Sequence, residues 1–318
     1  MRSSTKLVVV IPAYNEEEML PVTIPAMSEV LDRMVRTGKI SSSSKLLFVD
    51  DGSKDKTWLL IQQYQQINDF VSGISFSKNY GHQNALLAGL NVSKDADVVI
   101  TIDADLQDDI NAMEEMVDRY LEGYDVVYGV RNSRETDTFF KRNSALFFYK
   151  LMDKMGAKTI QNHADFRLMS RRSVDALLQY PERNVFLRGI VPQVGFKSIN
   201  VYYARNERKA GTSKYPLGKM IKFALDGITS FSTTPLRMIF WLGVITLTMS
   251  VVFIANTLIQ HLRGNTSVGW SSLMLSIWFV GGAQLISAGI LGEYLGKVFF
   301  EVKRRPRFNI AEDLYTNK

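Results

Sequence analysis

The chain has 318 residues, a formal net charge of +6 and no cysteine. This length fits one large domain or two modest ones, and the lack of cysteine excludes a disulfide framework. The positive charge suggests a nucleic-acid partner, but the basic residues gather near the apolar C-terminal third. Anionic lipid head groups attract basic residues placed there, so we expect a lipid bilayer as the partner and no nucleic acid.

Up to residue 128 the chain alternates apolar, strand-like runs with segments of helical spacing. Strands are expected at residues 6–11, 45–49, 71–76, 98–102 and 126–128. Helices are expected at residues 16–35, 57–64, 83–90 and 109–122. This alternation predicts an α/β fold with a mostly parallel sheet and short connections. Neither G-x-G-x-x-G nor G-x-x-x-x-G-K-[ST] is present, so dinucleotide-binding and P-loop sites are unsupported.

The apolar run at residues 98–102 ends in Asp103-Ala104-Asp105. In extended backbone, residues i and i+2 point to the same side, so both carboxylates can meet one hard cation. They would do so at the carboxyl end of the strand, where open α/β sheets bind ligands. Because Mg²⁺ sites combine one or two carboxylates with substrate phosphates, the pattern favours a cation that holds a diphosphate. The alternative is a polar strand end in which Asp108 caps the following helix.

Two long stretches in the C-terminal third contain no Asp, Glu, Lys or Arg. They are residues 238–262 and 264–292, and each exceeds the roughly 20 apolar residues that cross a bilayer. We therefore predict two transmembrane helices, at about 236–260 and 270–295, joined as a hairpin. A pair of buried core helices is the alternative, although such helices need shorter runs than these.

The flanks of this hairpin are basic, while its loop carries only Arg263. By the positive-inside rule, both flanks and the globular part face the cytoplasm, so the expected location is the cytoplasmic (inner) membrane. Directly before the first span, residues 217–231 place apolar side chains on one helical face. This favours an amphipathic helix on the membrane surface over one that packs on the globular domain.

Five motifs follow one another along the chain. They are Val8-Val9-Val10-Ile11-Pro12-Ala13-Tyr14-Asn15-Glu16, Val49-Asp50-Asp51-Gly52-Ser53, Asp103-Ala104-Asp105-Leu106-Gln107, Asp165-Phe166-Arg167-Leu168-Met169-Ser170 and Arg208-Lys209-Ala210-Gly211-Thr212-Ser213-Lys214. With the two apolar stretches, they resemble the family-2 glycosyltransferases of GT-A fold, in the polyprenyl-phosphate branch. That branch includes the dolichol-phosphate mannose synthases, and the resemblance is greatest to the bactoprenol (undecaprenyl-phosphate) glucosyltransferases. The Q-x-x-R-W motif of processive synthases is absent, which favours transfer of a single sugar.

The resemblance implies four parts of the chain. They are a GT-A catalytic domain at residues 1–215, a juxtamembrane amphipathic helix at 216–232, two transmembrane helices within 233–300 and a basic cytoplasmic tail at 301–318. It implies a nucleotide-sugar pocket formed by Pro12, Ala13, Tyr14, Glu16, Asp51, Asp103, Ala104 and Gln107. It also implies that Mg²⁺ or Mn²⁺ is held by Asp103, Asp105 and Gln107.

The implied reaction is an inverting transfer of glucose from UDP-glucose to undecaprenyl phosphate. Binding the acceptor phosphate requires positively charged side chains. Arginine is well suited, because its guanidinium can donate two parallel hydrogen bonds to one phosphate. The candidates are Arg131, Arg142, Arg208 and Lys214; a solvated basic surface is the alternative for each. Asp165 occupies the catalytic-carboxylate position of the family, where it acts as a base or orients Arg167 and the acceptor. A purely structural ion pair with Arg167 is a third alternative.

Other donors, such as GDP-mannose or a UDP-aminoarabinose derivative, fit the same motifs. A non-catalytic membrane scaffold that binds nucleotide sugars is a different class of function, and the intact Asp103 and Asp105 argue against it. A transporter lacks support because the long apolar stretches, residues 238–262 and 264–292, contain no Asp, Glu, Lys or Arg. A separate flippase and a downstream glycosyltransferase are therefore expected partners. Gly281 and Gly282 allow close helix approach, which suggests a homo-oligomer.

Overall fold

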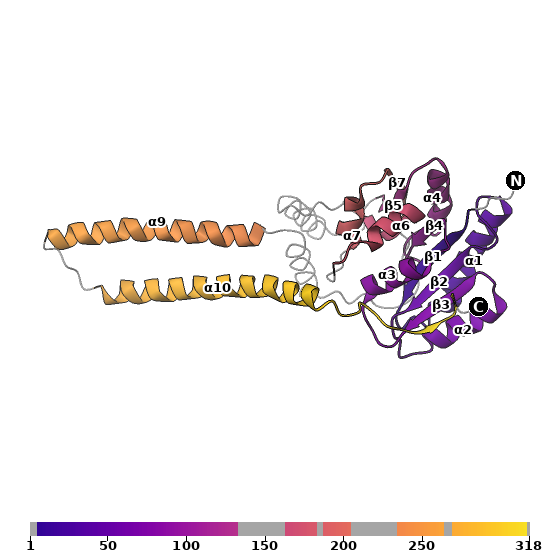
Figure 1. Ribbon diagram of the computed structural model, residues 1–318, viewed down its shortest axis with the longest axis horizontal. Helices are drawn as coiled ribbons and strands as arrows, with labels where there is room; N and C mark the ends of the chain where they lie inside the picture. Colours follow the sequence, from indigo (N-terminus) through magenta and orange to yellow (C-terminus); the bar gives the residue numbers. More distant parts are fainter. Residues whose placement is uncertain (1–4, 133–162, 183–186, 205–233, 264–268, 317–318) are drawn as a thin grey trace. The chain divides into compact units, whose positions relative to one another are not determined.

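The computed structural model describes residues 5–132, 163–182, 187–204, 234–263 and 269–316 (Figure 1). These residues fall into two compact units. The first contains the described residues up to 204 together with 305–316, and the second contains two long helices, α9 and α10. The amphipathic helix expected at 216–232 lies outside the described residues.

The first unit is an α/β fold built on one eight-stranded sheet. Its strands are β1 (Leu7–Ala13), β2 (Lys45–Asp50), β3 (Val71–Phe76), β4 (Val98–Thr101), β5 (Val126–Arg131), β6 (His163–Ser170), β7 (Ser198–Tyr203) and β8 (Ile310–Asp313). Their order across the sheet is β7-β5-β6-β4-β1-β2-β3-β8. The pairs β1–β2, β1–β4, β2–β3 and β5–β7 are parallel, whereas β6 and β8 pair antiparallel with their neighbours. The predicted α/β fold with a mostly parallel sheet is therefore confirmed.

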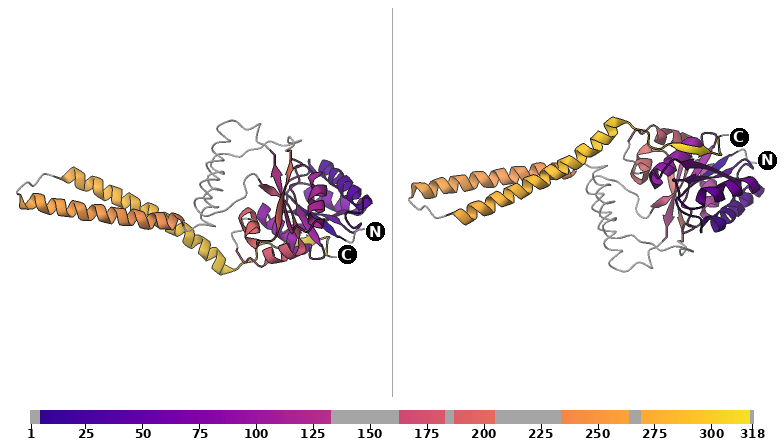
Figure 2. Two further views of the ribbon diagram at one scale, coloured as in Figure 1. Left: turned by 90° about the horizontal axis from the view of Figure 1, so that it is seen from above. Right: turned by 90° about the horizontal axis from the view of Figure 1, so that it is seen from below.

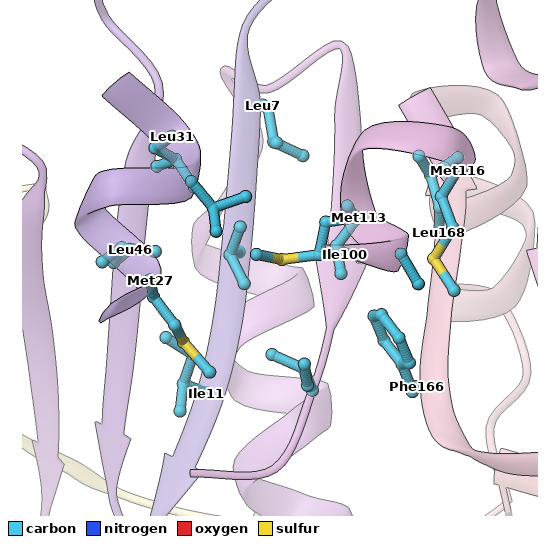
Figure 3. Packing of buried hydrophobic residues seen from close by; sticks show 14 of the residues in the cluster. Leu7, Ile11, Met27, Leu31, Leu46, Ile100, Met113, Met116, Phe166 and Leu168 are labelled. Atoms are coloured by element: carbon cyan, nitrogen blue, oxygen red, sulfur yellow. The ribbon is translucent and has the colours of Figure 1, made fainter. Parts of the chain in front are cut away.

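Helices cover both faces of this sheet. They are α1 (Leu20–Arg36), α2 (Thr57–Ile67), α3 (His82–Val92), α4 (Ala112–Leu121), α6 (Arg171–Leu178), α7 (Leu187–Ile190) and the 3-10 helix η1 (Val191–Val194). Leu7 and Ile11 of β1 pack with Met27 of α1 and Met113 of α4 in one apolar core (Figure 3). The other face of β1 carries Val10, against which α3 packs closely. Both faces of β1 are thus buried, which is why its sequence is apolar without alternation.

The predicted strands and helices up to residue 128 are all present, with shifted ends. Helix α1 begins at Leu20 instead of the expected residue 16, with Pro21 in its first turn, where a missing N–H costs nothing. The four residues before it form a loop in which the Glu16 N–H is held by Thr57 Oγ1 at 2.8 Å. This loop follows β1 and so stays at the carboxyl edge of the sheet.

The C-terminal residues differ from the expected basic tail. Residues 310–313 form β8, which pairs antiparallel with β3 at the edge of the sheet (Figures 1 and 2). The pairing is extended by a hydrogen bond from the Leu314 N–H to the Gly73 carbonyl, at 2.8 Å. The last part of the chain therefore belongs to the same compact unit as the parallel strands.

The second unit consists of α9 (Thr234–Leu262) and α10 (Trp270–Lys303). Among the described residues, one helix is long and apolar enough to cross a membrane, over Thr234–Phe253 with a mean hydropathy of 1.9. The two predicted segments are both helical. Helix α9 runs beyond both of its predicted ends, whereas α10 begins at the predicted residue 270 and runs beyond the predicted end at 295. The second membrane span stays a prediction.

Candidate active site

The carboxyl ends of β1 to β4 meet at one edge of the sheet because these strands are parallel. Ala13 pairs with Asp50, and Val10 pairs with Thr101. The loops that follow these strands therefore lie side by side. They carry most of the residues that the sequence analysis assigned to the nucleotide sugar and the metal ion.

The antiparallel strand β6 brings Asp165 to this same edge. Arg167 pairs with Thr101 in the sheet, so Asp165, two residues earlier, lies next to the residues that follow β4. The Thr101 hydroxyl donates a hydrogen bond to the Asp165 carbonyl. His82 joins the two carboxylates: its Nε2 lies 3.6 Å from Asp103 Oδ1 and 3.3 Å from Asp165 Oδ2. Asp103 and Asp165, which are 62 positions apart, thus share one site.

Asp165 is almost fully buried and is surrounded by donors. Arg167 Nη2 lies 2.6 Å from Asp165 Oδ1, and Arg188 Nη2 lies 3.2 Å from Asp165 Oδ2. Gln83 Nε2 lies 3.4 Å from the same Oδ2. Burial alone raises the pKa of Asp165, but the His82 hydrogen bond and the charges of Arg188 and Arg167 hold that pKa well below its usual range. This carboxylate is ionised at neutral pH.

Helices α3 and α7 position these donors. The Leu187 N–H donates to Gln83 Oε1 at 3.1 Å, and Arg167 Nη1 donates to the Leu187 carbonyl at 3.3 Å. Sequence analysis missed His82, Gln83 and Arg188 as site residues. The one signal for Arg188 was its charge within an otherwise apolar run. His82 gave no comparable signal, since it reaches the site through the start of α3.

Asp103 lies close to other carboxylates at the end of β4. Burial, together with the neighbouring carboxylates of Asp165, Asp105 and Asp108, raises its pKa to about 6, although the charge of His82 acts in the opposite direction. The Gln107 N–H donates to Asp105 Oδ1 at 3.2 Å, which fixes the loop after β4. Among the described residues, no three His, Asp or Glu side chains are grouped to hold a metal ion. Two carboxylates with excess negative charge nevertheless fit a cation whose other ligands are phosphate oxygens.

Asp51 holds the loop after β3. Its carboxylate, only 4% exposed, accepts hydrogen bonds from the Tyr80 N–H at 2.6 Å and the Gly81 N–H at 2.9 Å. Gly52 permits this close approach because its φ is +67° and a Cβ there would lie 2.7 Å from Asn79 N. Asp51 therefore shapes the site that His82 enters, and its contact with the nucleotide base stays a prediction.

The loop after β1 lies next to Asp51. Pro12 and Ala13 are buried, Tyr14 is exposed, and Glu16 is half-buried. The Asp51 N–H donates to the Ala13 carbonyl at 2.9 Å, which joins the two loops. Ala104 is buried too, and its carbonyl accepts a hydrogen bond from the Thr23 hydroxyl at 2.6 Å.

Arg131 ends β5 and pairs with a buried carboxylate. Its Nη2 lies 2.8 Å from Asp108 Oδ1, and the Tyr203 hydroxyl donates to the same oxygen at 2.7 Å. Helix α4 begins after Asn111 without a side-chain cap, so the alternative role of Asp108 as a helix cap is wrong. The Arg131 contact with an acceptor phosphate stays a prediction. The other candidates, Arg142, Arg208 and Lys214, lie outside the described residues.

Comparisons with known proteins identify the family of the chain. The model of the family "Glycosyl transferase family 2" matches residues 8–178. The chain is 53% identical over 318 residues to the uncharacterized glycosyltransferase YkoT of Bacillus subtilis (strain 168), covering 100% of this chain and 94% of that protein. It is 40% identical over 309 residues to the SfII prophage-derived bactoprenol glucosyl transferase of Shigella flexneri, covering 96% of this chain and 98% of that protein.

Among solved structures, glucosyl-3-phosphoglycerate synthase from Mycobacterium tuberculosis, in complex with Mn²⁺, UDP-glucose and phosphoglyceric acid, has a TM-score of 0.43 and 19% identity. That match covers 71% of this chain and 78% of that one. The family match is the informative result: it spans more than half of the chain and includes both Asp103 and Asp165. The resemblance in the sequence motifs is thereby confirmed, and the chain belongs to glycosyl transferase family 2.

Proposed function

We propose that the protein transfers one glucose from UDP-glucose to undecaprenyl phosphate at the cytoplasmic face of the inner membrane. The observation that carries this proposal is the 40% identity to a bactoprenol glucosyl transferase over 96% of this chain. That alignment takes in the long apolar helices as well as the α/β unit. A lipid acceptor gives those helices a function, because the enzyme must then work at a membrane surface.

In the proposed reaction, an oxygen of the lipid phosphate attacks the anomeric carbon of the sugar, and the nucleoside diphosphate leaves. Asp103 and Asp105 would hold Mg²⁺ or Mn²⁺, with Gln107 close by. A divalent cation at this place stabilises the charge that develops on the leaving diphosphate. A single displacement inverts the anomeric centre, so the enzyme needs no nucleophile of its own.

Asp165 has an orienting role in this proposal. The second pKa of the acceptor phosphate is about 6, by analogy with phosphoamino acids, so this group is largely ionised at neutral pH. A strong general base is therefore unnecessary. The low pKa of Asp165 and its contacts with Arg167 and Arg188 suit a group that fixes the position of two cations.

The donor is tested with the purified, full-length protein in lipid. Radiolabelled UDP-glucose, GDP-mannose and a UDP-aminoarabinose derivative are offered separately with undecaprenyl phosphate, and the labelled lipid is counted. We expect UDP-glucose to label the lipid fastest. Faster transfer from another donor would replace the sugar assignment, whereas no transfer from any donor would favour a non-catalytic nucleotide-sugar-binding scaffold.

The membrane arrangement is a second part of the proposal. We predict that α9 and α10 both cross the bilayer, with both termini in the cytoplasm and residues 261–269 outside it. Protease tags at residues 1, 265 and 318 would be compared in sealed, right-side-out vesicles. The tag at 265 should be cleaved from outside while the terminal tags are protected; the opposite pattern would contradict this topology.

A further inference from the structure

The C-terminal strap, residues 305–316, follows α10 and adds β8 to the sheet edge next to the candidate active site. Its pairing places Asp313 opposite Ile74 and Ile310 opposite Phe76, the last residue of β3. One residue further on, the Ser77 N–H donates to the Asn309 carbonyl at 3.1 Å. The strap therefore continues along the start of the loop that connects β3 to α3.

The strap also holds the side chains of this loop. Phe308 stacks on Phe76 with ring centroids 5.3 Å apart, and Asn309 Nδ2 donates to the Tyr80 hydroxyl at 3.0 Å. The Tyr80 N–H is one of the donors to Asp51. Two residues later, His82 begins α3 and reaches Asp165. One side of the site is thus connected to the strap through a stacked pair of rings, of which Phe76 is buried, and through hydrogen bonds at the surface.

A second contact reaches the opposite side of the site. Arg307 Nη2 donates to the Tyr180 carbonyl at 2.8 Å and to the Glu182 carbonyl at 2.9 Å. Both carbonyls follow α6, and the Tyr180 hydroxyl donates to the Gln193 carbonyl at 3.4 Å, on the 3-10 helix η1 that directly follows α7 and its Arg188. A guanidinium that binds two carbonyls of one segment fixes its direction more firmly than one neutral hydrogen bond.

We infer that the strap is a positioning clamp for the active site, with Arg307 as its principal positioning residue. This role rests on the proposed function, and in it the strap does not contact the substrate. Instead, it holds the segments that carry His82 and Arg188, the two groups that approach Asp165 from α3 and α7. Because the strap begins directly after α10, the membrane helices and the active site are joined through a segment of few residues.

The test compares Arg307→Ala with Arg305→Ala in the full-length protein in lipid, since Arg305 is an exposed arginine of the same strap. Hydrogen–deuterium exchange should rise in residues 77–92 and 187–194 of Arg307→Ala and stay unchanged in β1. The kcat should fall by about 10- to 100-fold, as small misplacements of catalytic groups do. Arg307→Lys should recover part of the loss, because one ammonium can reach one of the carbonyls. Arg305→Ala should match the wild type in each measurement.

A second pair of variants applies if Arg307→Ala does not fold. Asn309→Ala and Tyr80→Phe both remove the hydrogen bond between these side chains, and Tyr80→Phe also removes the contact of its hydroxyl with Ser77 Oγ at 3.3 Å. The double variant should therefore affect exchange and kcat no more than Tyr80→Phe alone. Unchanged kcat and KM despite faster exchange would reduce the strap to a structural element and overturn the inference. Failure of the proposed function is recognised separately, as lack of transfer by the wild type. In that case the affinities of the wild type and Arg307→Ala for UDP and for GDP are measured in the presence of Mn²⁺. Equal affinities in the two proteins would refute the positioning role of the strap.

Discussion

Asp103→Asn is expected to lower sugar transfer by at least about 100-fold and to raise the thermal stability of the metal-free protein at neutral pH. The loss of activity follows from removal of one of the two carboxylates that would hold the cation. The gain in stability follows from the raised pKa of about 6, which burial and the neighbouring carboxylates produce. The Asp103 carboxylate is therefore expected to be needed for activity and to lower the stability of the metal-free protein at neutral pH.

The pH dependence distinguishes this explanation from a general packing effect. An acid whose pKa is higher in the folded than in the unfolded protein costs no stability while both forms are protonated. The cost begins as the pH rises through the unfolded pKa near 4 and is complete above about pH 6. Asn carries no charge, so the variant should match the wild type near pH 4 and exceed it from pH 6 to 8.

Thermal unfolding of the solubilised protein from pH 4 to 8, with and without Mn²⁺, measures this effect. Added Mn²⁺ should stabilise the wild type and not the variant. Asp109→Asn is the control, because Asp109 is a carboxylate on the same loop whose Oδ1 accepts a hydrogen bond from the Asn111 N–H at 3.0 Å. Wild-type activity in Asp103→Asn, or full wild-type activity in EDTA, would remove the basis of the metal assignment.

Asp165→Asn is expected to destabilise the fold by about 3–5 kcal/mol, the cost of leaving a buried charge without its partner. The partner is Arg167, which is 1% exposed. The folded pKa of Asp165 lies below the unfolded value, so its stabilising effect is present above the unfolded pKa near 4. It is lost only as the pH falls through the folded pKa. The difference between wild type and variant should thus stay constant from pH 5 to 8 and shrink in stronger acid.

The activity of Asp165→Asn separates an orienting group from a base. General bases work best with a pKa near the operating pH, and that of Asp165 is far lower. We therefore expect a partial loss, seen as a higher KM for polyprenyl phosphate. Activity should recover between roughly pH 5 and 7 as the acceptor loses its second proton. The loss would instead be roughly 10²–10⁴-fold at every pH if Asp165 were the base.

Initial rates against acceptor concentration at several pH values measure this difference. Asp175→Asn is the matched control, since it removes an exposed carboxylate that pairs with Arg171 on α6 and should change stability by no more than about 0.5 kcal/mol. A pH-independent collapse of turnover at saturating acceptor, with folding and nucleotide binding intact, would show that Asp165 is the base.

The sequence predicted those strands that are buried on both faces, because burial alone explains their apolar runs. It missed β6, since Asp165 and Arg167 interrupt the apolar pattern of that strand with a buried ion pair. It missed β8 as well, because an edge strand of four residues with two acidic side chains resembles a solvated tail. The local sequence pattern therefore predicts a strand only where the buried side chains are also apolar: residues 165–170 of β6 are all buried, but Asp165 and Arg167 are charged.

The sequence allowed prediction of those candidate site residues that come directly after a recognisable strand. Asp103 and Asp105 were identified from their spacing after β4, and Asp165 from the family motif. His82 and Arg188 were missed because their proximity depends on the antiparallel register of β6 and on the packing of α3 and α7. These contacts join residues that are far apart in the sequence, so no local spacing of residues indicates them.

The return of β8 to the sheet limits how the chain can thread a bilayer. The α/β unit contains residues on both sides of the two long helices in sequence, ending at 204 before them and resuming at 305 after them. A chain that leaves one side of a membrane and comes back to pair with a strand there has crossed it an even number of times. A single crossing by α9 would therefore separate β8 from β3. Of the long helices in the described part of the chain, therefore, α9 and α10 either both cross the bilayer or both stay on one side of it.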